Sequence, residues 1–271
     1  MTKRVIKIFF IIILISTLSA FPVLADDANE LEEVVIEEDE KNEIEASASS
    51  DTKPTINSRR YAVYDRLSGR CIYGKDENKQ TAMASTTKIM SAVIIVENCN
   101  LEDIVTVTAK AAGVGGSRLG LHTDDKISVN DLLYGLMLRS GNDAAVALAI
   151  HTAGSVEEFA NLMNQKAEVL GLTNTHFVSP HGLDNSEHYT TAYELAKITD
   201  YALKNETIAK IVKTKTTTIS INGNPMQISN TNELLGNVEG VYGVKTGFTN
   251  NAGRCLVTSV KRGDMDVIIV V

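Results

Sequence analysis

The sequence predicts an α/β fold of the α+β kind, in which one antiparallel sheet is flanked by helices and carries a helical lobe. Two observations support this prediction. Short segments rich in β-branched and aromatic residues lie near both ends of residues 58–271 and are bounded by glycine-containing turns. Between them, residues 104–170 show a mostly helical pattern of apolar positions. The order of strands, then helices, then strands suits a sheet with a helical insert.

The first elements are a hairpin and a buried helix. Residues 60–65 and 71–74 are expected to pair around a turn at 67–69. The run that follows Ser85 is almost wholly apolar over residues 89–96. We therefore expect Ser85 at the N-terminus of a buried helix, where backbone N–H groups favour developing negative charge.

Helix signals then follow one another closely. Apolar residues at helical spacing over 129–137 predict a helix capped by Ser128, and a second apolar helix is expected over 144–150. The next helix begins with a capping box at Ser155 and ends at Gly171. A later helix starts at Thr191, where a glutamate again follows three residues on.

The last elements are strands. Residues 216–229 predict a hairpin that turns at the Asn-Gly pair 222–223. Residues 253–260 and 266–271 predict a second hairpin, with its turn at 262–263. Because the chain stops inside an apolar strand, we expect a C-terminally incomplete catalytic domain with an exposed sheet face and lowered stability.

The N-terminal region has the pattern of an export signal followed by a linker. Residues 1–25 combine a basic start, an apolar run and a small-residue cleavage site, which predicts a signal peptide; an uncleaved anchor is the alternative. Residues 26–45 contain 11 acidic residues and one lysine, a net charge of −10, whereas the whole chain carries −8. We expect residues 26–57 to be a disordered acidic linker, and 58–271 to be the folded domain.

Three short motifs carry the chemistry. They are Ser-Thr-Thr-Lys at 85–88, Ser-Gly-Asn at 140–142 and Lys-Thr-Gly at 245–247. A serine hydroxyl is a weak nucleophile until a base stands beside it. A lysine three residues later on a helix projects from the same face as the serine, so Lys88 can be that base. The second motif is expected between two helices, and the third on a strand.

Context separates these motifs from similar ones. A second Ser-x-x-Lys, at residues 50–53, lies in a polar segment with no apolar run after it. Each motif alone is a weak signal, whereas the three in this order and context are specific.

With these motifs, residues 60–271 resemble the serine penicillin-binding proteins and, more closely, the low-molecular-mass D-alanyl-D-alanine carboxypeptidases of peptidase family S11. The resemblance includes the segment 177–183, Phe-Val-Ser-Pro-His-Gly-Leu. It implies a β-lactamase-like fold and removal of the terminal D-alanine from peptidoglycan stem peptides through an acyl-enzyme, with β-lactams as inhibitors. It also implies action outside the cytoplasm, at the membrane face or cell wall.

The resemblance assigns roles to individual residues. Ser85 is the nucleophile, Lys88 the base, and Ser140 with Asn142 the proton relay and substrate-orienting pair. Substrate binding falls to the third motif and the two residues after it, namely Lys245, Thr246, Gly247, Phe248 and Thr249. The backbone N–H groups of Ser85 and Phe248 would form the oxyanion hole.

The chain departs from the family pattern in two ways, and two alternative functions remain open. Relatives often carry arginine where this chain has Thr231, and a further carboxylate-binding arginine would lie beyond residue 271. A class A-like β-lactamase is one alternative, although residues 179–184 lack the glutamate that such enzymes need. A catalytically inactive penicillin-binding fragment is the other.

Several classes of function are disfavoured. Without its acidic segment and signal, the chain has a net charge near −1, so nothing indicates a nucleic-acid partner. No metal or other cofactor is expected, because the five histidines lack metal-site spacing. Three of them fall within 176–188 and are expected to order a loop beside the site. The three cysteines leave at least one free thiol, and at least two are expected to be buried.

Overall fold

The structure is a computed structural model that describes residues 56–271. Residues Ser58–Val271 form one compact unit. The expected signal peptide and all but the last two residues of the expected linker lie outside the described residues.

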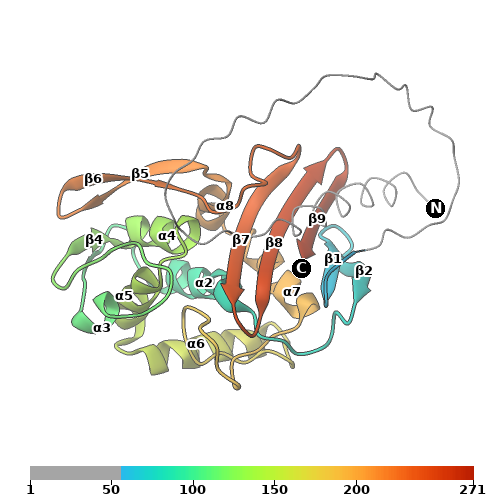
Figure 1. The fold of residues 1–271 in the computed structure, drawn as a ribbon, viewed down its shortest axis with the longest axis horizontal. Helices are drawn as coiled ribbons and strands as arrows, with labels where there is room; N and C mark the ends of the chain where they lie inside the picture. The colour runs from blue at the N-terminus through green and yellow to red at the C-terminus, as the bar shows by residue number, and fades with distance from the viewer. Residues whose placement is uncertain (1–55) are drawn as a thin grey trace, which may run out of the picture. The chain divides into compact units, whose positions relative to one another are not determined.

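A five-stranded antiparallel sheet forms one half of this unit (Figure 1). Its strand order is β2-β1-β9-β8-β7, so the first hairpin joins the C-terminal strands through β1 and β9. The bounds are Tyr61–Asp65 for β1, Arg70–Lys75 for β2, Val241–Thr249 for β7, Gly253–Arg262 for β8 and Met265–Val270 for β9. The predicted antiparallel sheet with strands from both ends of the domain is confirmed.

The helices form the other half of the unit and pack on the sheet. Their bounds are Ala84–Thr87 for the 3-10 turn η1, Lys88–Asn98 for α2, Val129–Leu138 for α4, Asn142–Ala153 for α5, Val156–Val169 for α6, Ala192–Ala202 for α7 and Glu206–Lys213 for α8. Helix α7 lies against β1 and β9, while α8 and η1 lie against β7. The edge strand β7 is therefore the strand beside the helical lobe (Figure 1).

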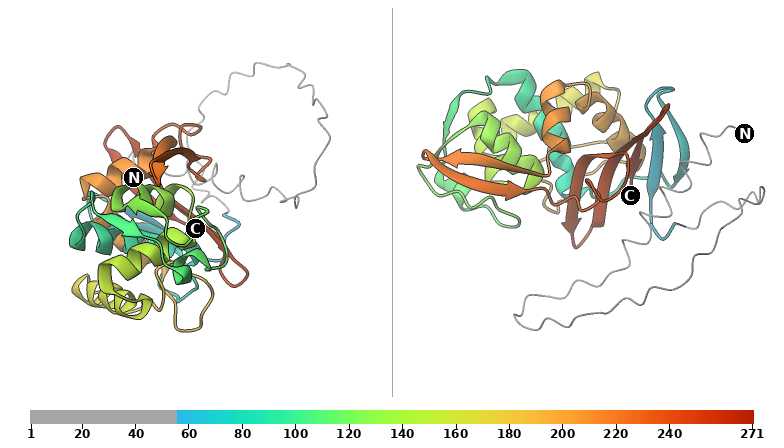
Figure 2. Two further views of the ribbon diagram at one scale, coloured as in Figure 1. Left: turned by 90° about the vertical axis from the view of Figure 1, so that its left-hand side faces the viewer. Right: turned by 90° about the horizontal axis from the view of Figure 1, so that it is seen from above.

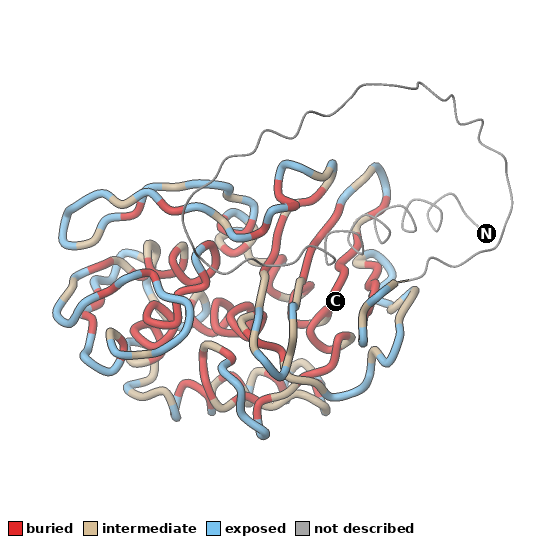
Figure 3. Tube along the Cα trace, viewed as in Figure 1, coloured by how far each residue is buried: buried red, intermediate tan, exposed pale blue. Residues whose placement is uncertain are grey.

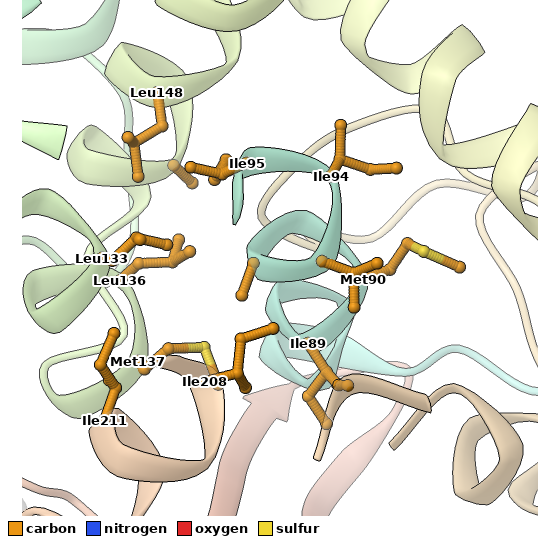
Figure 4. Close-up of a cluster of buried hydrophobic side chains, with 14 of the residues drawn as sticks. Ile89, Met90, Ile94, Ile95, Leu133, Leu136, Met137, Leu148, Ile208 and Ile211 are labelled. Atoms are coloured by element: carbon orange, nitrogen blue, oxygen red, sulfur yellow. The ribbon is translucent and has the colours of Figure 1, made fainter. Parts of the chain in front are cut away.

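Helix α2 is the centre of the hydrophobic core. Its residues 88–95 are all buried, because it contacts α4, α5, α6, α7 and α8. Figure 4 shows Ile89, Met90 and Ile95 of α2 among side chains from α4, α5 and α8, and Figure 3 shows the buried residues concentrated in this region. A helix that is apolar on every side must be buried on every side, so the run that follows Ser85 dictates this position.

The region 104–128 differs from the prediction of a mostly helical segment. It contains two short paired strands, β3 (Ile104–Thr106) and β4 (Lys126–Ser128), and one turn of helix, α3 (Ala109–Ala112). Between α3 and β4 the chain forms a loop with glycines at 113, 115, 116 and 120. The glycine content prevents a continuous helix here, so the prediction of a mostly helical segment was wrong for these residues.

Both predicted C-terminal hairpins are present. Strands β5 (Thr216–Ile221) and β6 (Asn224–Ser229) turn at Asn222 and Gly223, which both have positive φ. This hairpin and the β1–β2 pair lie at opposite ends of the unit (Figure 2). The β8–β9 turn falls at residues 263–264, one residue later than predicted, because Arg262 pairs with Met265. Val271 continues the ladder by exchanging backbone hydrogen bonds with Leu256.

The predicted hydroxyl caps are confirmed, whereas among residues 56–271 neither Glu158 nor Glu194 bonds back to the backbone N–H of its cap residue. The hydroxyls of Ser128, Ser155 and Thr191 each accept from the backbone N–H three residues later. The carboxylate of Glu194 does not complete a box with Thr191, because it accepts from the Asn174 N–H at 3.0 and 3.1 Å. Helix α6 ends before Gly171, whose φ is 66°. Within residues 56–271, none of the helices has the length and hydropathy needed to cross a membrane.

Candidate active site

Ser85 and Lys88 meet at the start of α2. Ser85 lies in η1, and Lys88 is the first residue of the α-helix that follows. The Lys88 Nζ lies 2.8 Å from the Ser85 Oγ, as the three-residue spacing predicts. The serine is partly exposed, whereas Lys88 is fully buried. The pair therefore presents an accessible hydroxyl with an amine behind it.

Two further oxygens surround the Lys88 amine. The Asn142 Oδ1 lies 2.7 Å from Nζ, and the backbone carbonyl oxygen of His181 lies 3.1 Å from it. Asn142 begins α5, and its Nδ2 donates to the Gly115 carbonyl at 2.7 Å. With the Ser85 hydroxyl, these groups fix the position of the amine from three different segments of the chain.

Ser140 lies in the tight connection between α4 and α5, as predicted. It has a positive φ of 59° and is 7% exposed. Within the described part of the chain, its hydroxyl forms no hydrogen bond with either Lys88 or Lys245. The structure thus places Ser140 two residues before Asn142, the first residue of α5, without a bonded contact to the lysines.

A buried carboxylate holds the loop that faces this motif. The Asp143 side chain is fully buried and accepts hydrogen bonds of 2.8 to 3.0 Å from the backbone N–H groups of Leu119, Gly120 and Leu121. Backbone donors at this distance compensate a buried negative charge. Asp143 thereby holds the 113–121 loop, which supplies the Gly115 acceptor of Asn142.

The third motif lies on the edge strand β7. Lys245 is 1% exposed, and its Nζ donates to the Thr246 carbonyl at 2.9 Å. The Thr246 hydroxyl lies 2.7 Å from the Thr231 hydroxyl. Thr231 is held in place because its backbone N–H donates to the Leu138 carbonyl at the end of α4. The position where relatives often carry arginine therefore contacts the third motif through a hydroxyl.

The glycine of this motif, Gly247, permits β7 to lie close to the turn that carries Ser85. A Cβ added at Gly247 would lie 2.9 Å from the Ser85 backbone nitrogen and 3.3 Å from that of Thr86. Phe248 is 65% exposed. The Thr249 hydroxyl accepts from the Ala252 N–H at 3.1 Å, and so belongs to the β7–β8 turn. The space that a side chain at 247 would fill is thus occupied by η1, the turn that carries Ser85.

Burial changes the protonation of both lysines. Burial first, and then the nearby Lys245 cation, lower the pKa of Lys88 well below its ordinary value, while Asp143 opposes this in part. Burial lowers the pKa of Lys245 to about 7. A neutral amine can accept a proton, so these shifts suit Lys88 to the role of a base at neutral pH.

Three contributors to this geometry were not predicted from the sequence. They are the His181 carbonyl, the Thr231 hydroxyl and the Asp143 carboxylate. A carbonyl has no sequence signature, and a threonine in a loop has almost none. Asp143 did carry a signal, because an acidic residue inside an apolar helical segment needs buried partners.

Among residues 56–271, none of the three cysteines forms a hydrogen bond with a side chain of the three motifs. Cys71, Cys99 and Cys255 are free thiols and only half-buried, so the expectation that at least two are buried was wrong. Burial raises the pKa of the Cys255 thiol to about 11, which keeps it protonated. Residues 56–271 contain no grouping of three or more histidine, cysteine, aspartate or glutamate residues that could hold a metal ion.

The site lies between a sheet and a helical lobe, and it combines a serine that has a buried lysine partner with a Ser-Gly-Asn connection and a Lys-Thr-Gly edge strand. This combination defines a serine-lysine acyl-transfer site of the penicillin-binding type. The family model of the D-alanyl-D-alanine carboxypeptidases, peptidase family S11, matches residues 47–271. The chain therefore belongs to this family.

Known relatives are similar in sequence and in structure. The chain is 40% identical over 215 residues to the D-alanyl-D-alanine carboxypeptidase DacF of Bacillus subtilis, covering 77% of this chain and 55% of DacF. It is 38% identical over 239 residues to the D-alanyl-D-alanine carboxypeptidase of Streptomyces sp. strain K15, covering 82% of each. The crystal structure of the Streptomyces K15 DD-transpeptidase matches with a TM-score of 0.77, covering 81% of this chain and 91% of that one.

The curated relatives differ in how much of their length is matched. The chain spans 55% of the Bacillus protein and 82% of the Streptomyces protein. It is also 36% identical over 230 residues to the D-alanyl-D-alanine carboxypeptidase DacC of Escherichia coli, covering 80% of this chain and 57% of DacC. The family match, over residues 47–271, includes all three motifs.

Proposed function

We propose that this chain is a serine D,D-carboxypeptidase that removes the terminal D-alanine from peptidoglycan stem peptides. The observation that carries the proposal is the 2.8 Å contact between the Ser85 Oγ and the buried Lys88 Nζ, whose pKa is lowered. The names of the curated relatives support the same reaction. Because its substrate is the cell wall, the enzyme acts outside the cytoplasm, and residues 1–25 would direct its export.

In the proposed mechanism, neutral Lys88 accepts the Ser85 proton while the Ser85 oxygen attacks the carbonyl carbon of the penultimate D-alanine. The tetrahedral oxyanion forms beside the backbone N–H groups of Ser85 and Phe248. The proton passes to the leaving D-alanine amine, with Ser140 as the relay. Water then attacks the ester, releases the shortened peptide and restores the Ser85 hydroxyl.

The remaining residues bind substrate. Lys245 carries the positive charge that attracts the terminal carboxylate, and the Thr246 hydroxyl, held by Thr231, donates to it. The Asn142 side chain, already bonded to Lys88, orients the substrate amide. A penicillin presents a carboxylate and a strained amide in a similar arrangement, so it would acylate Ser85 and inhibit the enzyme.

Two other activities would also proceed through an ester on Ser85. The crystal structure from Streptomyces K15 is described as that of a DD-transpeptidase, which favours transfer of the acyl group to an amine as a second candidate. A class A-like β-lactamase is disfavoured because Glu194, a glutamate near the segment 179–184, bonds to Asn174 and Thr175. Hydrolysis and transfer differ only in whether water or an amine attacks the ester.

The test is labelling with a fluorescent penicillin, followed by measurement of D-alanine released from a peptide that ends in D-Ala-D-Ala. We expect labelling to be lost in Ser85→Ala and retained in Ser50→Ala, the matched change in the similar motif at 50–53. Release of free D-alanine supports the carboxypeptidase. A new peptide bond to an added D-amino acid would support the transferase, and folded protein that takes up no label would overturn both.

A further inference from the structure

The turn that carries Ser85 is strained. Ala84, the residue directly before the nucleophile, has a φ of 47°. A residue with a Cβ is disfavoured in this region of backbone conformation, so surrounding contacts must hold it there. One such contact is visible within the turn, because the Thr87 hydroxyl donates to the Ala84 carbonyl at 2.8 Å.

A histidine from a distant segment completes this contact. His188 is 3% exposed, and its Nε2 lies 2.8 Å from the Thr87 Oγ1. Its Nδ1 accepts from the Val178 backbone N–H at 3.0 Å. A backbone N–H can only donate, so Nδ1 carries no proton and Nε2 must carry one. The hydrogen bonds therefore run in one direction, from Val178 through His188 and Thr87 to the Ala84 carbonyl.

The neighbouring residues of the same segment reach the other side of the turn. We call residues 176–188 the histidine loop. Its Pro180 carbonyl accepts from the Ser91 hydroxyl at 2.7 Å, and its His181 carbonyl is the third contact of the Lys88 amine. At Gly182, an added Cβ would overlap the Ala84 carbonyl oxygen. The loop thus contacts both the nucleophile turn and the base.

We propose that His188 is a positioning residue for Ser85. As the neutral Nε2–H tautomer, it holds the Thr87 hydroxyl in the orientation that donates to the Ala84 carbonyl. This hydrogen bond stabilises the strained backbone of Ala84 and so sets the distance between the Ser85 oxygen and Lys88. The inference rests on the proposed function for its kinetic effect and on the hydrogen bonds alone for its structural effect. Displacement of a reacting group by about 1 Å can cost about 100-fold in rate.

The experiment is a double-mutant cycle of His188→Leu and Thr87→Val. We expect each single variant to acylate with penicillin about 10- to 100-fold more slowly, and the double variant to be no slower than the worse single one, because both changes break one chain. His188→Gln, whose amide can both donate and accept, should recover most of the rate. With the peptide substrate, the loss should fall on kcat and not on KM.

Matched controls separate positioning from stability. Thr199→Val removes a buried hydroxyl that bonds within α7, and His176→Gln changes another histidine of the loop. Neither should slow acylation more than about threefold. Rates that fall as much in Thr199→Val as in Thr87→Val, or losses that simply add in the double variant, would overturn the proposal.

Two readouts do not depend on activity. Nitrogen-15 NMR of the wild-type ring should show a protonated Nε2, and amide hydrogen exchange over residues 84–88 should accelerate about equally in His188→Leu and Thr87→Val. A protonated Nδ1, or unchanged exchange in both variants, would overturn the inference. Wild-type protein that shows the expected NMR and exchange but takes up no penicillin would instead overturn the proposed function.

Discussion

Replacing Gly247 by alanine should slow acylation while barely affecting the rest of the fold. The new Cβ would lie 2.9 Å from the Ser85 backbone nitrogen, where ordinary van der Waals contact needs 3.4 to 4 Å. The φ of Gly247 is not in the left-handed region, so the whole effect is steric. Relief requires the nucleophile turn and β7 to separate by about half an ångström, which costs about 1–3 kcal/mol as overpacking.

That separation moves Ser85 away from the third motif. We expect the rate constant for acylation by a fluorescent penicillin to fall about 10- to 100-fold, with a fall in Tm of several degrees at most. Gly74→Ala is the matched control: it lies in β2, the other edge strand of the same sheet, and its neighbours are atoms of the flexible Glu77 side chain. A Gly247→Ala enzyme that acylates within threefold of wild type, at unchanged Tm, would refute the steric reasoning.

Three further results are expected. The kcat/KM for the peptide should decline above about pH 7, since Lys245, with a pKa of about 7 in the free enzyme, loses its charge there; a constant value from pH 6 to 9 would contradict this. Arg66→Ala should lower the free energy of unfolding by about 2–3 kcal/mol in urea titrations, because the guanidinium bonds to Asp200 and Asp266 at 2.8 and 3.1 Å. A loss below about 0.5 kcal/mol would show that these ion pairs contribute little to stability. Burial, and then His176, lower the pKa of His188 to about 4. The unfolded chain therefore binds a proton near pH 6.5 that the folded chain does not bind, and the free energy of unfolding should fall by about 2 kcal/mol between pH 7 and pH 5. This dependence on pH should be weaker in His188→Gln.

Much of the fold could be predicted because its signals are local. The Asn-Gly pair at 222–223 sets a hairpin through backbone conformation alone, and Ser128 sets a helix start through one hydrogen bond. The apolar run after Ser85 leaves α2 no position except the core. The prediction for 104–128 failed because short strands and glycine-rich loops depend on the segments that bind them, here the backbone donors held by Asp143.

The sequence by itself determined which groups we propose for the chemistry: a serine with a lysine three residues later, and two further motifs in a fixed order. Those signals are short-range, so spacing along one helix turn was enough to place the Lys88 amine beside the Ser85 hydroxyl. Only the tertiary structure decided the surroundings of this pair, namely the His181 carbonyl at Lys88, the hydroxyl of Thr231 at Thr246, and His188 at the Thr87 hydroxyl. These contacts join residues up to 101 positions apart, and their energies depend on burial and direction, which no local pattern records.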